Sequence, residues 1–130
     1  MNIFFDMDYT LLAPDGALRP GTRGLMQRLT GDGHALYVWS GAGTRWSEVR
    51  RHNLDPFVTD CFAKPLDNLS AGLGHLKLPA TPDLVIDDHP EIVAALGGIW
   101  TRPYVFDNEG DGEMDRLYQL ITEFAKTGQR

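Results

Sequence analysis

The sequence predicts an α/β protein with a mostly parallel sheet, and three observations support this fold class. Short apolar runs, which have the length of buried strands, alternate along the chain with longer segments that have the length of helices. Glycine and proline mark many of the boundaries between these segments. Short polar motifs directly follow four of the apolar runs, as expected where parallel strands end at one edge of a sheet.

Five strands are expected from the apolar runs. The first is followed by the turn-forming residues Pro14, Asp15 and Gly16, which predict a tight hairpin-like flap over 11–20. The run 104–106 is expected to continue the last strand. The expected strands cover 2–6, 34–39, 57–62, 83–87 and 99–101.

Helices are expected between the strands, and local residue types set their boundaries. Pro20 stands at the start of the first expected helix, and Gly31 lies just past its end. Thr44, with Glu48 nearby, is compatible with an N-terminal cap of the second. The expected helices cover 20–29, 44–52, 65–75, 90–97 and 112–125.

The chain is long enough and apolar enough to fold as one domain over residues 1–130. It has 130 residues, of which 42% are hydrophobic, an ordinary share for a globular protein. The last expected helix carries an apolar stripe at helical spacing, which predicts packing against the core. This stripe consists of Met114, Leu117, Leu120, Ile121 and Phe124.

Charge and cysteine content restrict the classes of function. The formal net charge of −6 disfavours broad nucleic-acid binding. Cys61 is the sole cysteine, so no disulfide can form within the chain, and we interpret it as a small buried strand residue. We expect a cytoplasmic protein without membrane contact, because no signal-peptide pattern opens the sequence and no apolar run approaches the roughly 20 residues that span a bilayer.

Four short motifs follow four of the expected strands in a fixed order. They are Asp6-Met7-Asp8-Tyr9-Thr10, Ser40-Gly41, Lys64 and Asp87-Asp88. Because ligands of open α/β sheets bind outside the carboxyl ends of the strands, we expect these motifs to converge. Carboxylates, a hydroxyl and an ammonium group together suit a divalent cation and a phosphoryl group.

The two carboxylates of the first motif suit phosphoryl transfer. Asp6 and Asp8 are two residues apart, so their side chains point the same way if the strand continues. One can attack phosphorus, and the other can act as a general acid and then as a general base. Asp6 and at least one of Asp87 and Asp88 can supply oxygen ligands to Mg²⁺. Lys64 can neutralise charge on the nucleophile and on the transferring group.

A phosphoryl oxygen is expected to bind beside Ser40, where Gly41 lets the backbone approach closely. Arg45 can bind a substrate phosphate, against the alternative of a solvated helix residue. Tyr9 can shape the pocket. His89 follows the acidic pair and is either a contact of metal or substrate, or a plain residue at a helix start.

Together these motifs resemble those of the haloacid dehalogenase (HAD) superfamily. The family pattern hhhhDxDxT, in which h is hydrophobic, is similar to residues 3–11, and the pattern hhhhS to residues 36–41. The pattern hhhhDD is similar to residues 84–88, and Lys64 stands where the family has an isolated lysine. The resemblance extends from residue 2 to about 106.

The resemblance implies a Mg²⁺-dependent phosphatase that works through an aspartyl-phosphate. Asp6 would be the nucleophile, and Asp8 the general acid and base, with its backbone carbonyl on Mg²⁺. Thr10 and Ser40 would organise the loop and bind phosphoryl oxygens, and Lys64 would steady the nucleophile. The implied metal site consists of Asp6, Asp8, Asp87 and Asp88, with the direct ligand of the last two left open.

The resemblance also implies a Rossmann-like, three-layer α/β/α sandwich with strand order 5-4-1-2-3. Only a short flap fits over 11–20, and one helix and one strand fill 41–64, so we expect no cap domain. A capless site suits a phosphorylated small molecule or a macromolecular phosphoester. A neighbouring subunit of a homo-oligomer could also cover it.

Three other functions compete with the phosphatase. A phospho-accepting receiver module has similar groups, but its acidic pair follows the first strand, whereas here the Asp-Asp pair comes last. A catalytically degenerate scaffold is disfavoured because all four motifs are intact. Phosphoryl transfer to an acceptor other than water usually needs a cap that excludes water.

Overall fold

The computed structural model describes residues 1–64 and 80–127. The helix expected at 65–75 therefore lies outside the described residues. The elements, in chain order, are β1 (Asn2–Asp6), α1 (Thr22–Gly31), β2 (Ala35–Ser40), α2 (Trp46–Arg51), β3 (Val58–Ala63), β4 (Leu84–Asp87), α3 (Pro90–Leu96), β5 (Gly98–Trp100) and α4 (Glu113–Thr127).

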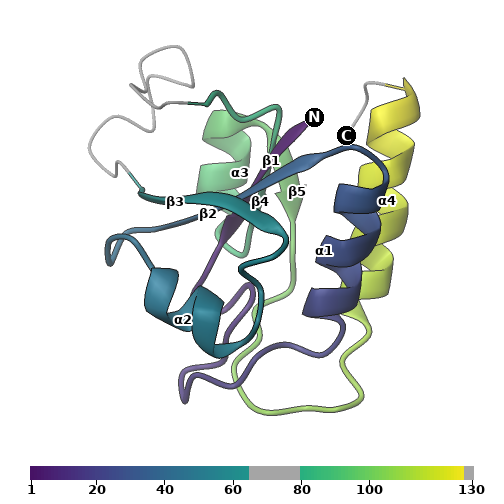
Figure 1. Cartoon of the computed structure of the whole chain (residues 1–130). Coiled ribbons are helices and arrows are strands. Elements are labelled where there is room, and N and C mark those ends of the chain that lie inside the picture. Colours follow the sequence, from purple (N-terminus) through teal and green to yellow (C-terminus); the bar gives the residue numbers. More distant parts are fainter. Residues whose placement is uncertain (65–79, 128–130) are drawn as a thin grey trace.

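The strands form one open sheet in the order β3-β2-β1-β4-β5, with every pair parallel (Figure 1). The predicted order 5-4-1-2-3 is the same order counted from the opposite edge, so it is confirmed. The register aligns Asp6 at the end of β1 with Trp39 on β2, and Ser40 with Ala63 on β3. Residues that follow neighbouring strands are thereby brought to one edge of the sheet.

Alternate residues of the strands face two separate apolar cores. On β1, Ile3 and Phe5 pack with residues of α1 and α4, whereas Phe4 packs with residues of α3. The Phe4 ring stacks on that of Tyr37 at a centroid distance of 4.8 Å. Figure 1 shows α1 and α4 side by side, with α3 apart from them across the sheet. Strands that are buried on both faces explain why their sequences are almost continuously apolar.

The hairpin-like flap predicted at 11–20 is present between β1 and α1. The amide of Ala13 donates to the carbonyl of Ala17 at 2.9 Å, and the Asp15 carboxylate accepts the Ala17 amide at 3.0 Å. Helix α1 begins two residues later than predicted, after the chain turns at Gly21 with φ +85°. The flap therefore returns the chain beside the end of β1, where the acidic motif lies.

The capping predicted at the second helix is wrong. Helix α2 begins at Trp46, its N-cap residue is Arg45, and no side chain caps it. The Glu48 side chain is not free to contribute to a cap at Thr44, because it accepts a hydrogen bond from Arg45. A contact made by Arg45 across the site, described below, sets this end of the helix.

Two predictions near the C-terminus are also wrong. The run 104–106 does not continue β5: Tyr104 turns inward and donates its amide to the Tyr9 carbonyl at 2.7 Å, while Val105 and Phe106 are exposed. Leu120 is 38% exposed, whereas the other members of the α4 stripe are buried. The stripe is narrower than predicted because Leu120 lies at its margin.

Candidate functional site

The four motifs meet at the carboxyl ends of the strands. Asp6 ends β1, Ser40 ends β2, Lys64 follows β3, and Asp87 ends β4. Residues of the first three motifs, together with His89 after the fourth, border a cavity of about 440 Å³. Its walls are formed by Asp6, Asp8, Tyr9, Ser40, Gly41, Ala42, Lys64, His89 and Ile92. The predicted convergence is therefore observed for motif side chains up to 82 positions apart in sequence, Asp6 and Asp88.

Lys64 bridges two buried carboxylates. Its Nζ lies 2.8 Å from Asp6 Oδ1 and 2.8 Å from Asp87 Oδ2, and the Lys64 side chain is only 3% exposed. Burial lowers the pKa of Lys64, but the two carboxylates outweigh this effect and raise it overall. The ammonium group is therefore charged and fixes the Asp6 carboxylate in one orientation.

The Asp6 carboxyl has a pKa raised to about 7. Burial is the main cause, the charge of Lys64 opposes it, and the charge of Asp87 adds to it. One ammonium does not offset the carboxylates gathered here. A further positive charge in the cavity would favour the ionised form of Asp6.

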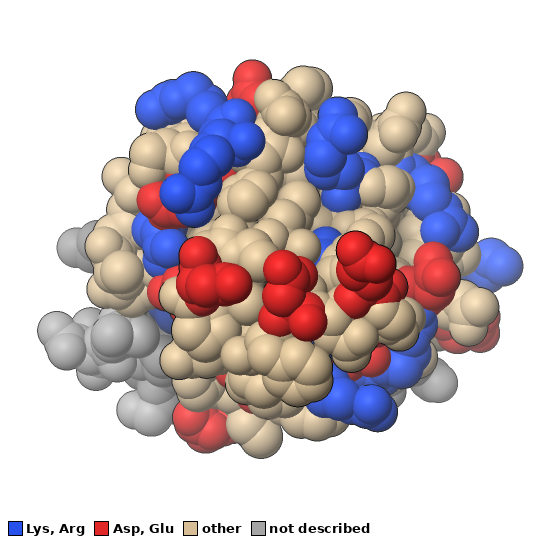
Figure 2. Space-filling view, turned by 90° about the horizontal axis from the view of Figure 1, so that it is seen from below, with Lys and Arg blue, Asp and Glu red and all other residues tan. Residues whose placement is uncertain are grey.

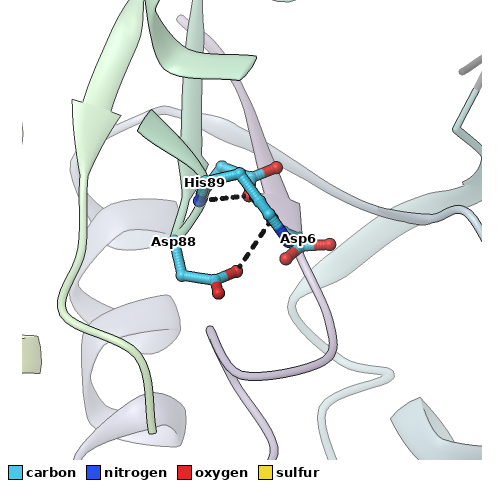
Figure 3. A group of neighbouring side chains, drawn as sticks. Asp6, Asp88 and His89 are labelled. Atoms are coloured by element: carbon cyan, nitrogen blue, oxygen red, sulfur yellow. Dashed lines mark hydrogen bonds and ion pairs between the residues drawn. The ribbon is translucent and has the colours of Figure 1, made fainter. Parts of the chain in front are cut away.

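Asp87, Asp88 and His89 complete a compact cluster with Asp6. One potential ligand atom from each of the four residues lies within 4.8 Å of the others. The His89 Nδ1 lies 2.9 Å from Asp87 Oδ1 and 3.3 Å from Asp88 Oδ1, and the hydrogen bond to Asp87 is the main cause that raises the pKa of His89. Figure 3 shows Asp6, Asp88 and His89 gathered where β1 and β4 end.

Thr10 contacts the carboxylates rather than the open cavity. Its buried hydroxyl lies 3.2 Å from Asp6 Oδ2 and 3.3 Å from Asp88 Oδ1. A hydroxyl has one proton, so it donates to one of these oxygens at a time. Thr10 therefore orients the carboxylates of Asp6 and Asp88 at the carboxyl end of the sheet.

Arg19 fixes the backbone of Thr10. The Arg19 guanidinium is buried and donates to the Thr10 carbonyl at 3.2 Å, to the Arg102 carbonyl at 2.7 Å and to Asp111 at 2.7 and 3.0 Å. These bonds join the flap to the loop between β5 and α4. A buried guanidinium is tolerated here because Asp111 offsets its charge and the carbonyls of Thr10 and Arg102 accept further hydrogen bonds from it.

Asp8 lies apart from the acidic cluster. Its two carboxylate oxygens accept hydrogen bonds of 2.8 and 3.1 Å from the Arg45 guanidinium, which also donates to Ser40 Oγ at 3.2 Å and to Glu48. Of the four predicted metal ligands, the structure brings the side chains of Asp6, Asp87 and Asp88 together. Asp8 is expected to contact the metal through its backbone carbonyl, and its side chain contacts Arg45.

The chain turns sharply between the two acidic residues and the flap. Tyr9 adopts φ 65°, the left-handed region that a tyrosine rarely occupies. Its amide donates to the Leu12 carbonyl at 2.8 Å, and its own carbonyl accepts the Tyr104 amide. These bonds hold the strained backbone in place, and Tyr9 stands 40% exposed at the rim of the cavity.

Two residues of this arrangement, His89 and Glu48, carry weak sequence signals, and a third, Arg19, carries none. His89 directly follows the acidic pair, so its neighbourhood is a usable signal. Glu48 stands three residues after Arg45, a spacing that permits a contact on one face of a helix. Nothing in the sequence marks Arg19, whose partner Asp111 is 92 residues away.

The face that carries the strand ends has a distinct charge pattern. Figure 2 views the molecule from below Figure 1, and acidic side chains gather across the middle of this face, with basic side chains nearer its margin. A cation is attracted to the centre of such a face, whereas an anion needs a compensating positive group to approach it.

No protein-family model matches the chain, and no curated protein matches it. Among the helices that the structure describes, none is both long and apolar enough to cross a membrane. The interpretation of the site therefore depends on its own geometry and chemistry.

Proposed function

We propose that the protein is a magnesium-dependent phosphohydrolase of the HAD superfamily that acts on a phosphomonoester through an aspartyl-phosphate. One observation carries this proposal. The Asp6 carboxylate borders a cavity of about 440 Å³, Lys64 fixes it at 2.8 Å, and three further metal-binding side chains lie beside it. The capless three-layer α/β/α sandwich belongs to the same proposal and is supported by the parallel sheet and its strand order.

The acidic cluster suits Mg²⁺. Carboxylate oxygens are the ligands that Mg²⁺ prefers in proteins, and Asp6, Asp87 and Asp88 would hold the ion. His89, hydrogen-bonded to the carboxylate of Asp87, would orient this ligand. When bound, Mg²⁺ would offset the charge of the carboxylates and polarise the phosphoryl group.

The residues of the chain supply the bond-making and proton-transfer groups. An Asp6 oxygen attacks phosphorus, the bond from phosphorus to the ester oxygen breaks, and that oxygen takes a proton from Asp8. Water then attacks the phosphorus of the aspartyl-phosphate and gives a proton to Asp8. Asp6 is regenerated, and the net products are an alcohol and inorganic phosphate.

The substrate is a phosphorylated small molecule or a macromolecular phosphoester. The cavity volume lies within the range that accommodates small-molecule ligands. The Ser40 hydroxyl and the backbone near Gly41 border the cavity and supply contacts for phosphoryl oxygens. A cytoplasmic location and a homo-oligomer that covers the site remain parts of this proposal.

Hydrolysis of p-nitrophenyl phosphate tests the proposal. We expect turnover by the wild type with Mg²⁺, loss of turnover with a chelator, and a fall of at least about 1,000-fold in Asp6→Asn. Asp55→Asn, which changes an exposed carboxylate outside the site, is the matched control and should keep full activity. Turnover that survives in Asp6→Asn would contradict the mechanism, and Mg²⁺ binding without turnover of any phosphoester would favour the degenerate scaffold.

A further inference from the structure

The Arg45 guanidinium contacts two side chains on one side of the cavity, Asp8 and Ser40, that the proposed reaction needs. It closes two hydrogen bonds, of 2.8 and 3.1 Å, onto the two oxygens of Asp8. The same guanidinium donates to Ser40 Oγ at 3.2 Å. Both oxygens of Asp8 are therefore already hydrogen-bonded before any substrate enters, whereas the Ser40 hydroxyl accepts from Arg45 and keeps its own proton to donate to a phosphoryl oxygen.

Glu48 anchors this guanidinium from the opposite side. It accepts a hydrogen bond from Arg45 Nε, and it stands three residues further along, on helix α2. The hydrogen bond from Arg45 is the main cause that lowers the pKa of Glu48, so the anchor is ionised at neutral pH. With Nε on Glu48, the terminal nitrogens of Arg45 contact Asp8 and Ser40, two residues that line the cavity.

The contact between Arg45 and Asp8 can be replaced by a contact between Arg45 and another anion. The Asp8 side chain is 52% exposed, so water can replace the guanidinium at little cost. A phosphoryl group carries more negative charge than a carboxylate and accepts the same paired hydrogen bonds from a guanidinium. A phosphate in the cavity can therefore compete with Asp8 for Arg45.

We propose that Arg45 holds Asp8 in the substrate-free protein and transfers its paired hydrogen bonds to the phosphoryl group when substrate binds, with Glu48 as its positioning residue. The exchange frees the Asp8 carboxylate, which then takes up a proton from water and gives it to the leaving oxygen, only when a phosphoryl group is present. This inference rests on the proposed function for the role of Asp8, whereas the binding of phosphate by Arg45 does not require turnover.

Binding of inorganic phosphate, measured by calorimetry in the presence of Mg²⁺, tests the exchange. We expect Arg45→Met to weaken phosphate binding about 10- to 100-fold, Arg45→Lys to recover part of the loss, and Glu48→Gln to weaken binding less than Arg45→Met. Arg50→Met is the matched control, because Arg50 is exposed on the same helix, and its affinity should match the wild type. Equal affinities of Arg45→Met and the wild type would overturn the proposal.

Competition between Asp8 and phosphate gives a second readout. Asp8→Asn should bind phosphate several-fold more tightly than the wild type, since the competing carboxylate is removed. If Asp8→Asn only relieves charge repulsion, it should raise the phosphate affinity of Arg45→Met by the same factor as that of the wild type. The exchange predicts a clearly smaller increase in affinity in the Arg45→Met background. Identical gains in both backgrounds would overturn the exchange.

Kinetic constants separate this inference from the proposed hydrolase. If the wild type hydrolyses p-nitrophenyl phosphate, Arg45→Met should raise KM more than it lowers kcat; a loss confined to kcat would show that Arg45 only positions Asp8 and would overturn the exchange. If the wild type binds phosphate through Arg45 but hydrolyses nothing, the hydrolase proposal fails and phosphate recognition by Arg45 stands.

Discussion

At the scale of single residues, the site depends on a buried ammonium between two carboxylates. Lys64 contacts Asp6 and Asp87 at 2.8 Å, and all three side chains are almost completely removed from solvent. Burying such a group is costly, so its presence is explained better by function than by stability. Lys64 thereby fixes the orientation of the Asp6 carboxylate, the nucleophile of the proposed reaction.

We predict that Lys64→Met lowers the free energy of unfolding by about 3–5 kcal/mol at pH 7, because two buried carboxylates lose their positive partner. Urea denaturation measures this change. Lys126→Met, which alters an exposed lysine on α4, should stay within about 0.5 kcal/mol of the wild type. Similar stabilities for the two variants would show that the bridge contributes nothing to folding.

Glu113 is a further buried carboxylate, which lies outside the cavity at the strand ends. Burial raises its pKa, but hydrogen bonds from Arg116, the Arg102 amide and the Thr101 hydroxyl, together with the Arg116 charge, lower it to about 2 overall. Because the folded pKa lies below the ordinary value of 4.5, Glu113 contributes stability above that value and loses it as the pH falls toward 2.

We therefore expect the wild type to exceed Glu113→Gln in stability by about 1–3 kcal/mol near pH 7, and the difference to shrink steadily between about pH 5 and pH 2. Denaturant unfolding over this pH range measures the difference. A difference that does not change with pH would mean that the ionised form of Glu113 is not the stabilising one.

At the scale of the elements, the β4–β5 pair requires a glycine. A Cβ on Gly98 would lie 2.0 Å from the Val85 carbonyl oxygen. We predict that Gly98→Ala costs at least about 2 kcal/mol, because the edge strand must shift to relieve the overlap. Gly24→Ala changes an exposed helical glycine of α1 with nothing within 4 Å and should stabilise the protein by about 0.5–1 kcal/mol.

Thermal and urea unfolding of the two glycine variants compare these effects directly. Opposite signs are expected from the same substitution. Equal effects would indicate that the close approach of β5 to β4 does not constrain the sheet.

Strands β1, β2 and β4 were predictable because they are buried along nearly their whole length and therefore read as apolar runs. The ends of helices were less predictable, because contacts between distant residues fix them. Arg45 is the N-cap residue of α2 and also bonds Asp8, which lies 37 positions earlier in the sequence. No local sequence pattern indicates this contact. The exposed Val105 and Phe106 show the opposite error, since an apolar pair was expected in a strand and lies in a loop.

At the scale of the whole molecule, parallel strands explain why the site could be anticipated. Polar residues placed after β1, β2, β3 and β4 must meet, because the strands run in one direction in one sheet. The identity of the acidic cluster followed from this rule. The contacts of Arg19 with Thr10 and of Arg45 with Asp8 did not follow from it, because they join segments that only the folded chain brings together.

The central claim is that Asp6 carries the phosphoryl group during turnover. The most direct test is to quench the protein during turnover of p-nitrophenyl phosphate with Mg²⁺, reduce it with borohydride, and locate the modified residue by mass spectrometry. Our account predicts reduction of the acyl phosphate at Asp6 in the wild type and in Asp55→Asn, and none with a chelator. Turnover that leaves Asp6 unmodified, or a modification at another residue, would contradict it.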